Sequence, residues 1–256
     1  MGEGNNRITI KTEGCQFMKF KKQTRLSDQM SDFSQEELAG ILSKADTELD
    51  WRDFDCLFQG RMPAGTYEEV RHYIPLACAY IENQADACGF LEHFSVWIED
   101  NLERLKEDDL IAPIVSAFHN LFRKTTSSFL LEENGDHGLY PSGCGSVESL
   151  LEALFRLSPT IPAFSPDALF AELKENMSLV HAEWIAYIST EMGLLSPERI
   201  RSALSASDYR KALDVLDDNL DAIMDDERLY AFWGKGYKAD ASCFRASGGS
   251  SARRRP

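Results

Sequence analysis

Apolar residues recur every three or four positions along most of the chain, which is the spacing of one face of an α-helix. Between residues 90 and 105 this spacing predicts a single amphipathic helix with charged side chains on its other faces. Its apolar stripe consists of Phe90, Phe94, Trp97, Ile98, Leu102 and Leu105. Further stripes run over residues 111–122, 150–155, 169–192 and 209–223. No strand pattern is visible within residues 33–233, so we expect an all-α fold, an irregular helical bundle of about eight or nine helices.

Two helix starts carry a capping box, in which the side chains at both ends of a four-residue motif accept backbone N–H groups of the first turn. Ser34 with Glu37 forms one such box, and Thr66 with Glu69 forms the other. The helix that begins at Thr66 meets Pro75, which lacks an N–H and crowds the preceding turn. We therefore expect that helix to kink or break near the proline.

Two serine–proline pairs mark helix starts in the second half of the chain. Ser165-Pro166 and Ser196-Pro197 each place a proline at the first helical position, where its missing N–H has no consequence. The apolar stripe over residues 169–192 fits either one long helix or two consecutive helices.

Charge separates the middle of the chain from its ends. The 256 residues carry a formal net charge of −15, but residues 1–32 carry +2 and residues 234–256 carry +5, which leaves −22 on residues 33–233. We expect a single acidic helical domain over 33–233, a loosely ordered extension over 1–32 and a disordered basic tail over 234–256. The glycine-rich stretch 131–145 is the boundary if the domain has two lobes.

The charge and the apolar runs exclude several classes of protein. So acidic a body repels phosphate, and we expect no binding to nucleic acid. The longest charge-free apolar runs, over residues 73–81 and 110–118, are nine residues each, about half of a membrane span. The first residues lack the apolar run of a secretory signal, and the six cysteines form no CxxC pair. We therefore expect reduced thiols in a cytoplasmic protein that does not enter a membrane.

Cys144 and His137 are the catalytic candidates. Cys144 precedes the helix that carries the stripe at 150–155, and the free N–H groups at a helix start favour a thiolate. His137 lies seven residues earlier and could serve as its base. A small enzyme that uses this pair, or clustered carboxylates in a cleft, is thus one hypothesis. No third group is identifiable, and a glycine-rich connector explains the same residues, so the sequence favours a non-enzymatic protein.

Two metal motifs are incomplete. Glu69 and His72 have the spacing of a di-iron bundle, which needs that pair twice, and the chain has it once. Asp217–Asp221 resembles the start of a calcium loop, but Ala222 replaces the glycine of the turn and Arg228 replaces the bidentate glutamate. We predict no metal site and no cofactor.

Aromatic residues mixed with carboxylates stand at residues 51–58. Such a mixture is found in binding surfaces with large apolar anchors. Trp51, Phe54 and Phe58 lie at helical intervals, however, and this spacing favours a place in the core.

Aspartates at helical intervals mark the last predicted helix. They are Asp214, Asp218, Asp221 and Asp225, and Asp226 extends the row. Aspartate is a poor helix former, and negative charge near a helix C-terminus opposes the helix dipole, so local stability does not explain the row. We interpret it as a docking face for a basic protein partner, which predicts an adaptor or an inhibitor. An ordinary solvated face, or the basic tail folded back onto the row, are the alternatives.

Overall fold

The computed structural model describes residues 20–27, 33–59, 64–83, 88–129, 131–133, 139–141, 144–175, 177–190 and 197–219. The first half of this part contains α1 (Gln35–Ser43), the 3₁₀ turn η1 (Asp46–Glu48), α2 (Trp51–Leu57), α3 (Tyr67–Val70), the 3₁₀ turn η2 (Arg71–Tyr73), α4 (Ile74–Asn83), α5 (Cys88–Asp100), α6 (Leu102–Glu107) and α7 (Ile111–Thr126). The second half contains β1 (Leu131–Glu133), β2 (Leu139–Pro141), α8 (Cys144–Leu157), the 3₁₀ turn η4 (Pro162–Phe164), α9 (Asp167–Glu175), α10 (Leu179–Thr190), α11 (Pro197–Ala203) and α12 (Ala206–Asp218). The prediction of an all-α irregular bundle is confirmed.

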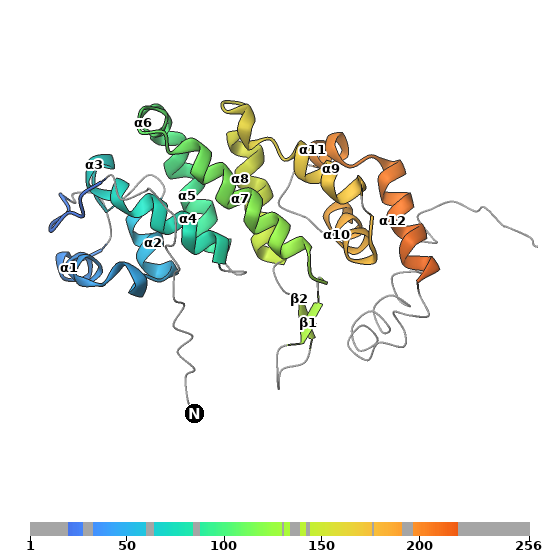
Figure 1. Ribbon diagram of the computed structural model, residues 1–256, viewed down its shortest axis with the longest axis horizontal. Coiled ribbons are helices and arrows are strands. Elements are labelled where there is room, and N and C mark those ends of the chain that lie inside the picture. Colours follow the sequence, from blue (N-terminus) through green and yellow to red (C-terminus); the bar gives the residue numbers. More distant parts are fainter. Residues whose placement is uncertain are drawn as a thin grey trace, which may run out of the picture.

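The helices are spread along the longest axis of the molecule, with the first half of the chain toward one end and the second half toward the other (Figure 1). The α1–α3 region forms one end of this row and α12 forms the other. The closest helix packing joins helices that are not consecutive in the sequence, namely α5 with α8, α10 with α12 and α4 with α7.

The two predicted capping boxes stand at the starts of α1 and α3. The Ser34 hydroxyl accepts the N–H of Glu37 at 3.2 Å, and the Glu37 carboxylate accepts the N–H of Ser34 at 2.7 Å. The Glu69 carboxylate accepts the N–H of Thr66 at 2.9 Å, where α3 begins. The expected break falls before Pro75: η2 ends at Tyr73, and Pro75 stands in the first turn of α4, where its missing N–H costs no hydrogen bond.

The helix predicted over residues 90–105 is wrong as a single element, because α5 ends at Asp100 and α6 begins at Leu102. Between them, Asn101 has φ −114° and ψ 17°, outside the helical range, although its N–H still donates to the Trp97 carbonyl at 3.1 Å. The stripe over residues 169–192 resolves into two helices, α9 and α10.

A short hairpin corrects the prediction that residues 33–233 contain no strand. β1 and β2 pair in an antiparallel register that sets Leu131 opposite Pro141. Strands of three residues are too short for alternation to be visible in the sequence. α8, which follows the hairpin, packs against α5, which precedes it.

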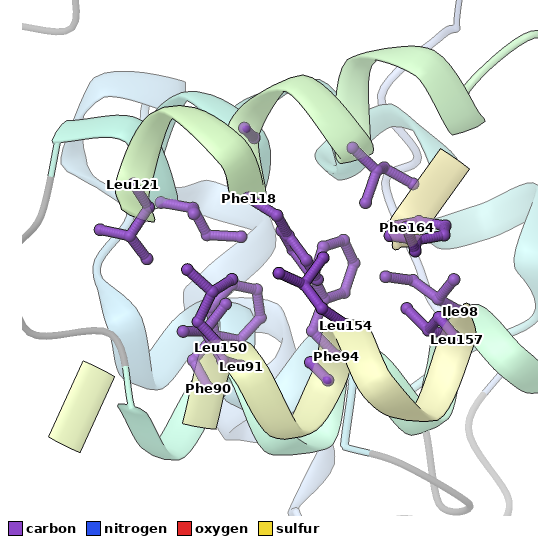
Figure 2. Packing of buried hydrophobic residues seen from close by; sticks show 14 of the residues in the cluster. Phe90, Leu91, Phe94, Ile98, Phe118, Leu121, Leu150, Leu154, Leu157 and Phe164 are labelled. Atoms are coloured by element: carbon purple, nitrogen blue, oxygen red, sulfur yellow. The ribbon is translucent and has the colours of Figure 1, made fainter. Parts of the chain in front are cut away.

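The centre of the core lies among α5, α7 and α8 (Figure 2). Its labelled side chains are Phe90, Leu91, Phe94, Ile98, Phe118, Leu121, Leu150, Leu154, Leu157 and Phe164. The Phe118 ring from α7 lies 6.3 Å from that of Phe94 and 5.9 Å from that of Phe164, centroid to centroid. Each of the three helices turns its apolar stripe toward this cluster, as an amphipathic helix must if it is to leave water.

The core interpretation of the aromatic segment at 51–58 is confirmed for two of its three rings. Phe54 and Phe58 are fully buried, and the Phe58 ring lies 4.9 Å from that of Phe94. Trp51 is 46% exposed at the start of α2. In the part of the chain that the structure describes, it is the one large hydrophobic side chain that is exposed.

Residues 20–27, which belong to the extension predicted over 1–32, are among the described residues. Leu26 is only 2% exposed and belongs to the core. The rest of that extension, residues 1–19 and 28–32, and the predicted tail 234–256 lie outside the described residues. None of the helices described is both long and apolar enough to span a bilayer.

Candidate functional site

α12 begins with a capping box and ends in the row of predicted aspartates. The Ser205 hydroxyl accepts the N–H of Asp208 at 3.2 Å, and the Asp208 carboxylate accepts the N–H of Ser205 at 2.9 Å. The pKa of Asp208 is lowered, because the hydrogen bonds from Ser205 and the nearby lysines outweigh the opposing effect of burial. Ala212 and Leu216 are buried on the side of α12 that packs against α10.

The opposite side of α12, which we call the acidic face, carries Asp214, Asp217 and Asp218, and all three side chains are exposed. None of them forms a salt bridge within the part of the chain that the structure describes. Asp221, Asp225 and Asp226 lie outside the described residues. The aspartates at positions 214 and 218 are thus exposed as predicted, and their role in binding stays a prediction.

Two cations reduce the charge at the N-terminal half of the acidic face. Arg210 and Lys211 are exposed on α12, four and three positions before Asp214. Side chains at these spacings are neighbours on a helix surface. The last turn of α12 contains Asp217 and Asp218 and no basic residue. Negative charge is therefore least compensated at the C-terminal end of the helix.

The catalytic candidates receive no test from the geometry. Cys144 is the first residue of α8, as the sequence predicts for a cysteine at a helix start. Its side chain and the whole of His137 lie outside what the structure describes. Nucleophilic catalysis by this pair stays a prediction.

The two residues of the possible di-iron motif have other partners. The Glu69 carboxylate accepts hydrogen bonds from Thr66 and Ser27, and His72 Nδ1 lies 2.8 Å from the Phe20 carbonyl oxygen. Asp217 and Asp218 are helical, which is incompatible with a calcium loop at that position. Among the described side chains, no group of three or more His, Cys, Asp or Glu is placed to hold a metal ion.

A second surface was not predicted from the sequence. Residues 20–27, which we call the strap, lie across the α1–α3 end of the molecule. The surface that receives them consists of η1, α3, η2 and the residues that lead into them, and we call it the strap-binding surface. Its contacting residues are Lys44, Asp46, Gly65, Glu69, Arg71, His72 and Tyr73.

Glu69 holds the C-terminal end of the strap. Its two carboxylate oxygens each lie 3.1 Å from the backbone nitrogen of Ser27, and Oε2 also accepts the Ser27 hydroxyl at 2.7 Å. Burial acts to raise the pKa of Glu69, but the hydrogen bonds from Ser27 and Thr66 outweigh it and hold the pKa below its ordinary value of 4.5. One carboxylate therefore caps α3 and anchors the strap.

The remaining contacts fix the other end and the middle of the strap. Lys22 Nζ donates to the Lys44 carbonyl at 2.7 Å and to Asp46 Oδ1 at 3.0 Å. Because a carbonyl oxygen only accepts, His72 Nδ1 carries the proton in its bond to Phe20. Leu26 packs so closely on Gly65 that a Cβ there would come within 3.2 Å of Leu26 Cδ2.

We expect Glu69→Gln to lower the free energy of unfolding by about 1 kcal/mol at pH 7, because the charged acceptor of three donors becomes a neutral one. The depressed pKa stabilises the fold above pH 4.5, and this contribution is lost as the pH falls through the lower value of the folded protein. Urea unfolding of both proteins at pH 7 and at pH 3 should therefore show a difference that closes on acidification.

Glu68→Gln is the matched control for this prediction. Glu68 is adjacent, and its side chain is 57% exposed in a salt bridge to Arg104. Its loss should change the unfolding free energy by less than about 0.5 kcal/mol. An equal effect of the two substitutions would contradict the role assigned to Glu69.

A cluster of charged side chains connects α7 and α9 and stabilises their packing. Arg123 donates two hydrogen bonds of 2.7 Å to the two carboxylate oxygens of Glu172, and they lower the pKa of Glu172. Burial, with Arg123 nearby, lowers the pKa of His119, so this histidine favours its neutral form. The cluster joins two helices through a bidentate ion pair.

Comparison with known proteins gives no match: no protein family, no curated protein and no solved structure resembles the chain above the level of chance. The function is therefore inferred from the acidic face and the strap-binding surface.

Proposed function

We propose that this protein is an interaction module, an adaptor or an inhibitor, that binds a basic protein partner through the acidic face of α12. The observation that carries the proposal is the exposure of Asp214, Asp217 and Asp218 without a salt bridge to any described residue. Carboxylates that keep their full charge at a surface attract and orient a cationic partner.

The position of the acidic face supports this proposal. α12 is at one end of the row of helices, and its outward side is not covered by another described helix (Figure 1). Asp217 and Asp218 stand in the last turn, where negative charge opposes the helix dipole at a cost of about 0.3–1 kcal/mol each. Their presence weakens the helix, whereas their charge favours a cationic partner.

We further propose a cytoplasmic location for this interaction. Cys78 is a buried thiol that is not part of a disulfide, and burial raises the pKa of Cys78, which keeps its thiol protonated and unreactive. Such thiols are typical of proteins from reducing compartments. The net charge of −15 disfavours nucleic acid as the partner.

The test reverses two charges of the acidic face. Asp214→Lys with Asp218→Lys should weaken binding to a basic partner captured from the source cell by about tenfold or more and should flatten its salt dependence. Binding of the purified partner is measured by titration calorimetry at several salt concentrations. The variant should fold at least as stably as the parent protein, because lysine near a helix C-terminus is favourable.

Glu99→Lys with Asp100→Lys is the matched control. Both residues are exposed, and their reversal changes the net charge of the protein by the same amount at a different place. The control variant should keep most of the affinity. Equal weakening in the two variants would mean that binding depends on the net charge of the protein and not on the acidic face. Unchanged binding in the α12 variant would refute the proposal.

A further inference from the structure

The contacts of the strap resemble those of a peptide bound to a protein surface. It forms neither helix nor strand, and none of its backbone groups pairs with a backbone group of the described remainder of the chain. Instead, side chains of the strap-binding surface form hydrogen bonds with its backbone at both ends. His72 donates to the Phe20 carbonyl, and Glu69 accepts the Ser27 N–H.

The strap-binding surface also distinguishes between the side chains of the strap. It takes the Lys22 ammonium between Asp46 and the Lys44 carbonyl, and it buries Leu26 almost completely. The Phe20 ring lies 4.5 Å from the guanidinium of Arg71. By contrast, three side chains of the strap are exposed and lack any such contact, namely Lys21, Thr24 and Arg25. The surface therefore selects an aromatic residue, a lysine two positions later, a leucine four positions after the lysine, and a serine.

We infer that the strap-binding surface is a second binding site of this protein, which takes a basic, leucine-containing segment of a partner protein and which the strap occupies in cis. Charge complementarity supports this partner, because Asp46 and Glu69 are the polar anchors and the occupant contributes a lysine. The inference does not depend on the acidic face, which lies at the other end of the row of helices.

The strap then acts as an internal competitor. A tethered segment is present at an effective concentration that reaches the millimolar range, so a partner segment must bind tightly or be abundant to displace it. Displacement is feasible because Ser27 is exposed and Lys22 is only half-buried, so water can replace both of their contacts. Leu26 is the single deeply buried anchor.

The experiment measures whether the site accepts a peptide in trans. A fluorescein-labelled peptide with the sequence of residues 18–29 is titrated with the full chain, and binding is followed by fluorescence anisotropy. The full chain carrying Lys22→Ala with Ser27→Ala has a weakened strap and an unchanged core. It should bind the peptide about tenfold or more tightly than the parent chain does, because less competition remains.

Three control variants make the result specific. Lys21→Ala with Thr24→Ala removes the same kinds of side chain from exposed positions of the strap and should leave peptide affinity at the parent level. Adding Asp46→Asn and Glu69→Gln to the weakened-strap variant should abolish peptide binding while circular dichroism shows an intact helical fold. Asp214→Lys with Asp218→Lys should leave peptide binding unchanged, which separates this site from the acidic face.

Three outcomes would overturn the inference. The first is the absence of peptide binding to the weakened-strap variant, and the second is equal binding to that variant and to its Lys21 and Thr24 control. The third is a concentration-dependent dimer of the parent chain in which Leu26→Asp abolishes association, since the occupant would then be the strap of a second copy rather than a partner segment.

Discussion

Phe118→Ala is expected to lower the free energy of unfolding by about 3–5 kcal/mol, the range for the truncation of a fully buried phenylalanine. Phe118 is completely buried in the middle of α7, between Phe94 of α5 and Phe164 of η4. Truncation removes its apolar contacts and leaves a cavity that the rings on either side cannot fill without moving. Guanidinium unfolding at pH 7, followed by circular dichroism, measures the loss.

Trp51→Ala is the control for this prediction. It removes a larger aromatic side chain, but Trp51 is 46% exposed, so much less apolar surface returns to water. We expect a loss below about 1 kcal/mol. A loss as large as that of Phe118→Ala would contradict the placing of the core among α5, α7 and α8.

Lys44→Met is expected to cost about 2–3 kcal/mol, the second largest effect. Lys44 Nζ lies 2.7 Å from both carboxylate oxygens of Asp53, whose side chain is only 6% exposed and which also accepts the N–H of Asp50 at 2.9 Å. Loss of the ammonium leaves a buried carboxylate without a cation. The cost stays below that of a fully buried pair because Lys44 itself is partly exposed.

Lys106→Met tests whether burial, rather than the ion pair as such, sets this cost. Lys106 Nζ lies at the same distance of 2.7 Å from Glu103, but the Glu103 side chain is 80% exposed. The surface pair should contribute less than about 0.5 kcal/mol. Similar losses in the two variants, measured by urea unfolding, would contradict this reasoning.

The helices were predictable because burial against one core imposes the helical period on the sequence. The stripe of α7 shows this directly: Ile114, Phe118 and Phe122 are all fully or almost fully buried. The capping boxes at Ser34 and Ser205 are equally local, since each needs only a side chain and the backbone three residues away. Ser34 was recognised from the sequence, whereas the second box, in which aspartate takes the place of glutamate, was not.

The missed features depend on single contacts or on distant residues. The division between α5 and α6 lies in the backbone conformation of one residue, Asn101, and the apolar period continues across it. The strap has no period of its own, and its order comes from partners such as Glu69, which lies 42 positions after Ser27. Leu26 is a single apolar residue between polar ones, so the sequence holds little signal of its burial.

The candidate sites were predictable to different degrees. Helical spacing alone was sufficient to place Asp214 and Asp218 on the exposed side of α12. The strap-binding surface was not predictable, because it is assembled from η1, α3 and η2, and no sequence motif links its residues to those of the strap. Two residues of this surface, Glu69 and His72, do stand out in the sequence, but only because they have the spacing of a di-iron ligand pair.

The end-to-end order of the helices has a consequence for the way the protein opens. α12 packs chiefly against α10. Detachment of α12 therefore exposes the interface between these two helices to solvent and leaves the core among α5, α7 and α8 packed. Backbone amides should therefore exchange with solvent in a gradient, fastest at α12 and slowest in the middle helices. Binding of the proposed partner to α12 would then stabilise the end of the molecule that unfolds most readily.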